Sequence, residues 1–181
     1  MKLKIALCVA AAVLLQSSLG GLWRPLGYAD LPLVVVAYFA LRRDPLLAVI
    51  IGTVAGLATD VLSVGLLGAN GFTKTLTAYL IAAIVTRVML DNPLFRIPVL
   101  AGAAVFDSIV YIFLHRLLGQ ALTPVGPSLA ETVAYKIIWT TVAGTIIAYA
   151  LDRFFSDTAG QRRQFAFRRR VARRSLGRRK Y

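Results

Sequence analysis

Three ionisable residues lie inside long apolar stretches of this sequence, where a charge is costly. Asp60 lies in an apolar run that begins near Pro45, and Asp107 and Lys136 lie within two later runs. A carboxylate or an ammonium group at mid-membrane costs about 2.5 to 3.5 kcal/mol on membrane-insertion scales. Such residues face other helices and mark functional or structurally critical positions. We therefore take Asp60, Asp107 and Lys136 as the candidate site.

Depth along the helices indicates which of these charges can meet. If the third apolar helix enters the membrane near Leu46, Asp60 lies about 21 Å along it at 1.5 Å per residue, in its outer third. Lys136 lies about 9 Å deep in the last helix if that helix enters from outside, so an Asp60–Lys136 ion pair is predicted. Asp107, about 15 Å into the fifth helix, is the second candidate partner of Lys136. The alternative to both pairs is that each charge is neutralised or hydrogen-bonded locally.

The sequence supplies no other constellation of reactive residues. It contains no HExxH, no P-loop, no Gly-x-Ser-x-Gly and no cluster of histidine with cysteine or carboxylates. Metal-dependent hydrolysis, nucleotide hydrolysis and serine catalysis therefore lack their parts. Asp60 and Asp107 also lack the Tyr-Asp and Gly-x-Gly-Asp settings of intramembrane aspartyl proteases. We predict a protein that is not an enzyme and that uses no cofactor or metal.

The elements that must position these charges are membrane helices. With 58% hydrophobic residues, 16% charged residues and a mean hydropathy of +0.71, the 181-residue chain does not match an ordinary soluble domain. A membrane-spanning helix needs roughly twenty apolar residues. Six apolar runs of about this length or somewhat shorter cover residues 3–22, 26–41, 46–67, 73–90, 97–118 and 130–151. The predicted fold class is all-α, a polytopic membrane protein with six transmembrane helices over residues 1–155, followed by an arginine-rich tail over 156–181.

The distribution of basic residues predicts the topology, because basic residues remain on the cytoplasmic side. If all six runs cross, the inner side outside the tail carries Lys2, Lys4, Arg42, Arg43, Arg87 and Arg96, against Arg24, Lys74 and Arg116 outside. The alternative is five spans, in which the short 26–41 run does not cross. Five spans give a weaker charge asymmetry, so we expect six spans with both termini in the cytoplasm.

Small residues share one face of the third helix with Asp60. Ala48, Gly52 and Gly56 precede it at four-residue spacing, which repeats on one side of a helix. Gly52 and Gly56 also form a small-xxx-small pair, which lets another helix approach closely. Two interpretations remain open, namely packing within the protein and a contact face for the helix of a partner.

The end of the chain carries most of the formal net charge of +13. Residues 161–181 hold ten basic residues and no acid, namely Arg162, Arg163, Arg168, Arg169, Arg170, Arg173, Arg174, Arg178, Arg179 and Lys180. Phe165 and Phe167 are interleaved with them, which favours a segment lying on anionic phospholipid, where each basic residue contributes about 1 kcal/mol. The alternative is a disordered extension that only fixes the topology. Nucleic-acid binding is not expected, because no RNA-binding fold accompanies the charge.

Residues 28–90 resemble one family of bacterial membrane proteins. The features that carry the resemblance occur in a fixed order: Leu31-Pro32 with its apolar run, Leu41-Arg42-Arg43, the stripe of Gly52, Gly56 and Asp60, and Gly65-Leu66-Leu67-Gly68-Ala69-Asn70-Gly71. This order is similar to that of the MreD family of rod shape-determining proteins. Residues 97–152 resemble the family in hydropathy and length only, and the arginine-rich tail has no counterpart in it.

The resemblance implies a multi-pass protein of the bacterial inner (cytoplasmic) membrane that belongs to the cell-elongation complex of rod shape and peptidoglycan synthesis. Such a protein is a non-enzymatic scaffold in helix–helix contact with a single-pass MreC-like partner, acting with peptidoglycan synthases and the actin-like MreB. The resemblance also implies a fold similar to the substrate-binding subunits of energy-coupling factor transporters. The alternative function is a small-molecule, vitamin-like binding subunit of a membrane transporter, with its pocket under the outer loops.

Overall fold

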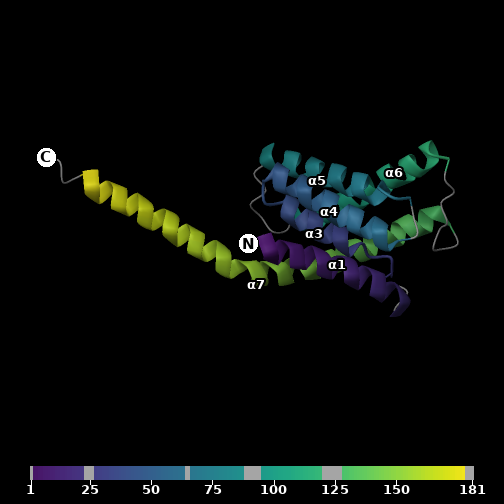
Figure 1. The fold of residues 1–181 in the computed structure, drawn as a ribbon, viewed down its shortest axis with the longest axis horizontal. Coiled ribbons are helices and arrows are strands. Elements are labelled where there is room, and N and C mark those ends of the chain that lie inside the picture. Colours follow the sequence, from purple (N-terminus) through teal and green to yellow (C-terminus); the bar gives the residue numbers. More distant parts are fainter. Residues whose placement is uncertain (1, 23–26, 64–65, 88–94, 120–127, 178–181) are drawn as a thin grey trace. The chain divides into compact units, whose positions relative to one another are not determined.

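The computed structural model describes residues 2–22, 27–63, 66–87, 95–119 and 128–177. Within them the regular secondary structure is helical, as the all-α prediction requires. The helices are α1 (Lys2–Leu22), α3 (Leu31–Ala40), α4 (Pro45–Leu62), α5 (Ala69–Arg87), α6 (Arg96–Leu117) and α7 (Leu129–Gly177). Figure 1 shows α1, α3, α4, α5 and α6 lying side by side as a bundle.

The chain divides into two compact units, Met1–Ile146 and Ile147–Tyr181. The first unit contains α1 to α6 and the start of α7, and it holds the candidate site. In the second unit the backbone of α7 remains helical as far as Gly177. The side chains of the ten basic tail residues lie outside the described residues, so their placement on phospholipid stays a prediction.

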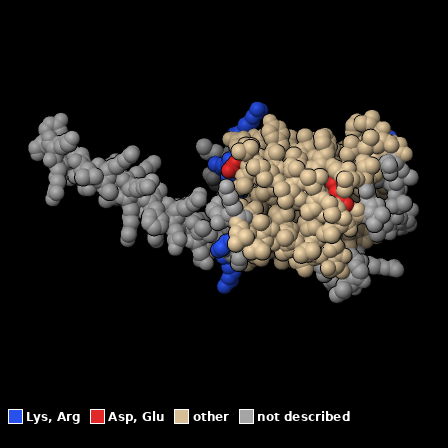
Figure 2. Space-filling model, in the orientation of Figure 1, with Lys and Arg blue, Asp and Glu red and all other residues tan. Residues whose placement is uncertain are grey.

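Within the part of the chain that the structure describes, three helices are long and apolar enough to cross a membrane: α4, α6 and the Leu129–Arg153 part of α7. Two further helices are apolar but shorter, namely Leu3–Ser18 within α1, and α3. On the face drawn in Figure 2 most of the described surface belongs to uncharged residues, and most of the basic side chains gather at one end. An apolar flank with charged ends suits a protein surrounded by lipid.

Helix α3 is half the length of a membrane span and is enclosed by protein. All ten of its residues are buried, and α1, α4, α5 and α6 pack against it. At 1.5 Å per residue it is about 15 Å long, against about 30 Å of hydrocarbon. The predicted 26–41 run therefore contains a helix over only part of its length, and this helix belongs to the core of the bundle.

The beginning of α3 has its backbone N–H groups satisfied by neighbouring side chains. The N–H of Leu31 donates to Oε1 of Gln16 on α1 at 2.9 Å. The N–H of Leu33 donates to Oδ1 of Asp30 at 3.0 Å, and Pro32 between them has no N–H to satisfy. An unpaired backbone N–H away from water costs several kcal/mol. Because these donors are paired, α3 can begin inside the protein.

Candidate functional site

The glycine stripe of α4 is covered by α5. Ala48, Gly52 and Gly56 are buried. A Cβ atom on Gly52 would lie 2.8 Å from the carbonyl oxygen of Lys74, and one on Gly56 would lie 2.6 Å from the Cα of Gly71. The missing side chains therefore allow the backbones of α4 and α5 to approach closely. The helix of a partner has no room on this stripe, so the stripe packs within the protein.

Asp60 is buried and is bound by the start of α5. Its Oδ1 accepts from the backbone N–H and the side-chain amide of Asn70, at 3.1 and 2.9 Å. Its Oδ2 accepts from the backbone N–H groups of Gly68 and Gly71, both at 2.9 Å. The N-terminal N–H groups of a helix favour an anion in this position. Local hydrogen bonding thus describes Asp60, and the predicted Asp60–Lys136 ion pair is wrong.

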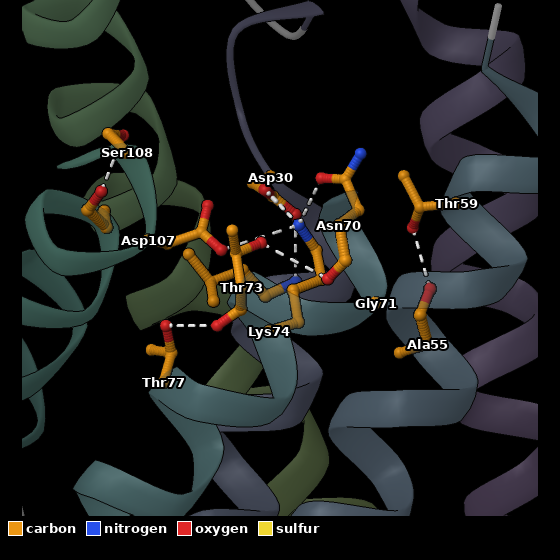
Figure 3. A network of polar contacts seen from close by, with 12 residues as sticks. Asp30, Ala55, Thr59, Asn70, Gly71, Thr73, Lys74, Thr77, Asp107 and Ser108 are labelled. Carbon is orange, nitrogen blue, oxygen red and sulfur yellow. Dashed lines mark hydrogen bonds and ion pairs between the residues drawn. The ribbon is translucent and has the colours of Figure 1, made fainter. Parts of the chain in front are cut away.

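Lys136 lies instead in a cluster of four charges, Asp30, Lys74, Asp107 and Lys136, which we call the tetrad. The Nζ of Lys136 is 2.8 Å from Oδ2 of Asp107 and 3.3 Å from Oδ2 of Asp30. The Nζ of Lys74 is 2.8 Å from Oδ2 of Asp30 and 3.9 Å from Oδ1 of Asp107. Figure 3 shows Lys74 between Asp30 and Asp107. The second candidate partner, Asp107, is therefore the one that Lys136 contacts most closely.

The tetrad joins four helices that are far apart in the sequence. Asp30 caps the N-terminus of α3, and Lys74, Asp107 and Lys136 lie on α5, α6 and α7. Thr140, one turn after Lys136, also accepts from the N–H of Asp30 at 3.0 Å. Two carboxylates and two ammonium groups give the tetrad a formal charge of zero. The cluster therefore fixes the mutual arrangement of α3, α5, α6 and the start of α7.

The members of the tetrad differ in exposure. The side chains of Lys74 and Asp107 are fully buried, whereas that of Asp30 is 12% exposed and that of Lys136 is 23% exposed. Oδ1 of Asp107 has no hydrogen-bond partner among the described residues. Removing one partner of a buried ion pair costs about 3 to 5 kcal/mol, because the other charge stays behind without compensation. The buried half of the tetrad is thus the part most sensitive to substitution.

Asn70 connects the tetrad to Asp60. Its Oδ1 accepts from Nζ of Lys74 at 3.2 Å, while its Nδ2 donates to Asp60. Asn70 and Lys74 are four residues apart, a spacing that places both on one face of a helix. Asp60, Asn70 and the tetrad therefore form one polar network that runs from the end of α4 to the start of α7.

Asp30 and Lys74 were missed as members of the candidate site. The charge count places Lys74 on the outer side, because it is the second residue of the 73–90 run. In the structure α5 begins at Ala69, so Lys74 lies inside the helix. Asp30 carried a usable signal, since an aspartate shortly before a proline at the first helical positions indicates a helix N-cap.

Comparisons with known proteins bear on the whole bundle. The model of a family described as rod shape-determining protein MreD matches residues 6–156, from α1 into α7. No curated protein and no solved structure matches the chain. The expected likeness to the substrate-binding subunits of energy-coupling factor transporters therefore stays a prediction.

Proposed function

The chain belongs to the MreD family of rod shape-determining proteins, and we propose that it is a non-enzymatic scaffold of the membrane complex that elongates the bacterial cell wall. The observation that carries this proposal is the family match over residues 6–156, which covers far more of the chain than the 28–90 block that carried the resemblance. Membership makes the chain a membrane protein with a role in cell shape, and the finer assignments below are proposals.

The geometry of the bundle core supports a scaffold. Each charged group of the tetrad faces an opposite charge within 4 Å, and Asp60 is held by four N–H donors. Groups matched in this way hold helices in place. A scaffold needs helices fixed relative to one another so that its outer surface keeps one shape for its partners.

We propose that the direct partner is a single-pass MreC-like protein, with peptidoglycan synthases and the actin-like MreB as further members of the complex. Because α5 covers Gly52 and Gly56, the partner's helix would lie on the outward apolar surface of the bundle instead. That surface is large, since α4 alone exposes Leu46, Ile50, Val54 and Val61 by 51% or more. Without a hydrophobic driving force between helices in lipid, shape and close packing would decide the contact.

We propose a location in the inner membrane, with six spans over residues 1–155, both termini in the cytoplasm, and the 156–181 tail on anionic phospholipid. The connection of the end of α4 to the start of α5 through Asp60 supports antiparallel neighbours. The burial of Lys74 strengthens the charge argument, because it removes a basic residue from the expected outer side.

Co-purification tests the scaffold proposal. The full chain with a C-terminal affinity tag is extracted from its host in mild detergent and captured, and an unrelated tagged membrane protein serves as the control. We expect a single-pass MreC-like protein to be enriched over the control in a fixed ratio to the chain. Equal recovery from the two samples would contradict the proposed partner.

The second candidate function, a binding subunit of a transporter, is favoured by one observation. A cavity of about 210 Å³ lies beside Asp30 and Lys136. Pockets for drug-sized ligands occupy about 300 to 1,000 Å³, so this cavity is small for a vitamin. The scaffold therefore remains the preferred function. A ligand of this cavity would have to be smaller than a vitamin.

A further inference from the structure

The cavity beside the tetrad has apolar atoms over most of its wall, and six residues with polar or charged side chains contribute to its lining. They are Gln16 of α1, Tyr28 and Asp30 ahead of α3, Thr59 of α4, and Thr132 and Lys136 of α7. Its walls thus come from the start of α3 and α7 and from the end of α1 and α4, which is the side that the proposed topology places outside the cytoplasm. In that topology, molecules of the outer leaflet or of the space beyond it would be the ones to reach the cavity.

Half of the tetrad faces this cavity. Asp30 and Lys136 line it and are 12% and 23% exposed, whereas Lys74 and Asp107 are fully buried and do not line it. The attraction between the charges of a purely structural cluster is strongest when all of them are enclosed, because water weakens it. The open half therefore offers one negative and one positive group to a molecule in the cavity.

Both of these groups keep hydrogen-bonding capacity. The ammonium of Lys136 has three N–H donors, and its partners in the tetrad are Oδ2 of Asp107 and Oδ2 of Asp30. Oδ1 of Asp30 accepts one bond, from the N–H of Leu33. A third donor on Lys136 and a further lone pair on Asp30 can therefore engage a ligand.

We propose that the cavity binds a small zwitterion, with the ammonium group of the ligand on Asp30 and its carboxylate or phosphate on Lys136. The tetrad has no net formal charge, and its two open groups are 3.3 Å apart. A simple anion on Lys136 would be repelled by Asp30, and a simple cation on Asp30 would be repelled by Lys136. A molecule that carries both charges satisfies both groups.

Two further observations fit this class of ligand. The volume of about 210 Å³ suits a group the size of an amino acid or of phosphoethanolamine. Tyr28 lines the cavity and lies 5.5 Å from Tyr135, centroid to centroid, and aromatic rings attract ammonium groups. The zwitterion can be a free molecule or the headgroup of a phospholipid, and the test separates these two sources.

The first arm of the test uses a free zwitterion. The full chain, in a detergent free of phospholipid, is titrated with phosphoethanolamine by calorimetry. Separate titrations use its two halves: ethanolamine, which carries only the ammonium group, and inorganic phosphate, which carries only the anionic group. We expect saturable binding of phosphoethanolamine and affinities for the halves that are lower by about tenfold or more, because each half loses one ionic contact.

The second arm uses the lipid. The chain is placed in phosphatidylglycerol nanodiscs with and without phosphatidylethanolamine, and lipid retained on the protein is measured by native mass spectrometry. Retention of phosphatidylethanolamine over phosphatidylglycerol, with no binding of free phosphoethanolamine, supports the proposal with a lipid headgroup as the source. Binding of free phosphoethanolamine supports it with a soluble source. Binding in neither arm overturns it.

Matched variants locate the binding in both arms. Thr59→Leu fills the cavity from α4 and Thr132→Leu fills it from α7. The Thr59 hydroxyl donates to the Ala55 carbonyl of its own turn at 2.8 Å, and the Thr132 hydroxyl donates to the Ser128 carbonyl at 3.0 Å. Thr145→Leu is the control, since its hydroxyl makes the same kind of bond to Thr141 at 2.7 Å away from the cavity. We expect about a tenfold or larger loss of binding in the first two variants and none in the control. Wild-type binding by whichever cavity variant folds would overturn the proposal.

Discussion

The ammonium group of Lys136 and the carboxylate of Asp107 lie 2.8 Å apart and join α7 to α6 inside the bundle. Asp107 is fully buried, so neither residue can be replaced without consequence for the other. The pair also belongs to the tetrad, in which Asp30 and Lys74 share the same charges. The stability of the bundle should therefore depend on these side chains jointly.

A double-mutant cycle tests the coupling of Asp107 and Lys136. Asp107→Leu or Lys136→Met alone leaves an uncompensated buried charge and should lower the free energy of unfolding by about 3 to 5 kcal/mol. The double variant should lose less than the sum of the two, with an interaction energy of about 1 to 3 kcal/mol. Thermal and denaturant unfolding in detergent measure these losses.

The comparison for this cycle is Asp60 with Lys136. Among the described residues these two are linked through Asn70, Lys74 and then Asp30 or Asp107. Their interaction energy should therefore be smaller than that of Asp107 with Lys136. A larger interaction energy for Asp60 and Lys136 would contradict the arrangement of charges described above.

Asp60→Ala should destabilise the connection between α4 and α5. It removes the acceptor of three backbone N–H groups and one side-chain amide, and each buried unpaired donor costs about 1 to 3 kcal/mol. Hydrogen exchange should show lost protection of the amides of Gly68, Asn70 and Gly71. Asp44→Ala is the matched control, because Asp44 is an exposed N-cap that accepts from a single N–H, that of Leu47, and its loss should cost about 1 kcal/mol. Equal effects of the two variants would contradict the role assigned to Asp60.

Each of the six apolar runs contains a helix, and hydropathy also singled out two of the four tetrad residues. Asp107 and Lys136 stood out because they are ionisable residues in apolar runs. Their pairing could not be derived, because depth along a helix gives the level of a charge and says nothing about which helices are neighbours. Asp60 lies at a depth that suits Lys136, yet its carboxylate is bound by backbone N–H groups at the start of α5.

Helix boundaries account for most of the remaining differences. The apolar run that begins at residue 46 was expected to reach residue 67, whereas α4 ends at Leu62, because leucines continue into the following loop and hide the end of the helix. The early start of α5 then places Lys74 in the second turn of the helix instead of at its outer end. The half-length of α3 was also invisible to hydropathy, since it depends on Gln16 and Asp30 supplying its cap.

Gly52→Leu and Gly56→Leu should each prevent correct packing of α4 on α5. A Cβ on Gly52 already meets backbone atoms of α5 at 2.8 to 3.0 Å, so neither helix can yield without moving its backbone. Gly102→Leu is the matched control, because a Cβ at Gly102 of α6 has no atom within 4 Å. Size-exclusion profiles of fluorescent fusions should show aggregation or loss for the first two variants and a wild-type peak for Gly102→Leu. Wild-type profiles for all three would contradict the close packing of α4 and α5.

Reporter fusions test the proposed topology. Alkaline phosphatase, which is active only outside the cytoplasm, should be silent at the C-terminus and active after Arg24 or after Gly119. Green fluorescent protein at the C-terminus should fluoresce, which controls for expression. An active phosphatase at the C-terminus would overturn the cytoplasmic placement of both termini, and silence after Arg24 would favour five spans.

Cell shape after deletion of the gene tests the central claim most directly. In a rod-shaped host with no second copy, the cells should lose their rod shape and become round, and the wild-type chain expressed from a plasmid should restore the rods. The variant Gly102→Leu should restore them as well, because it leaves the packing of the bundle intact. Cells that keep a normal length and width without the gene would contradict the assignment of this chain to rod-shaped growth.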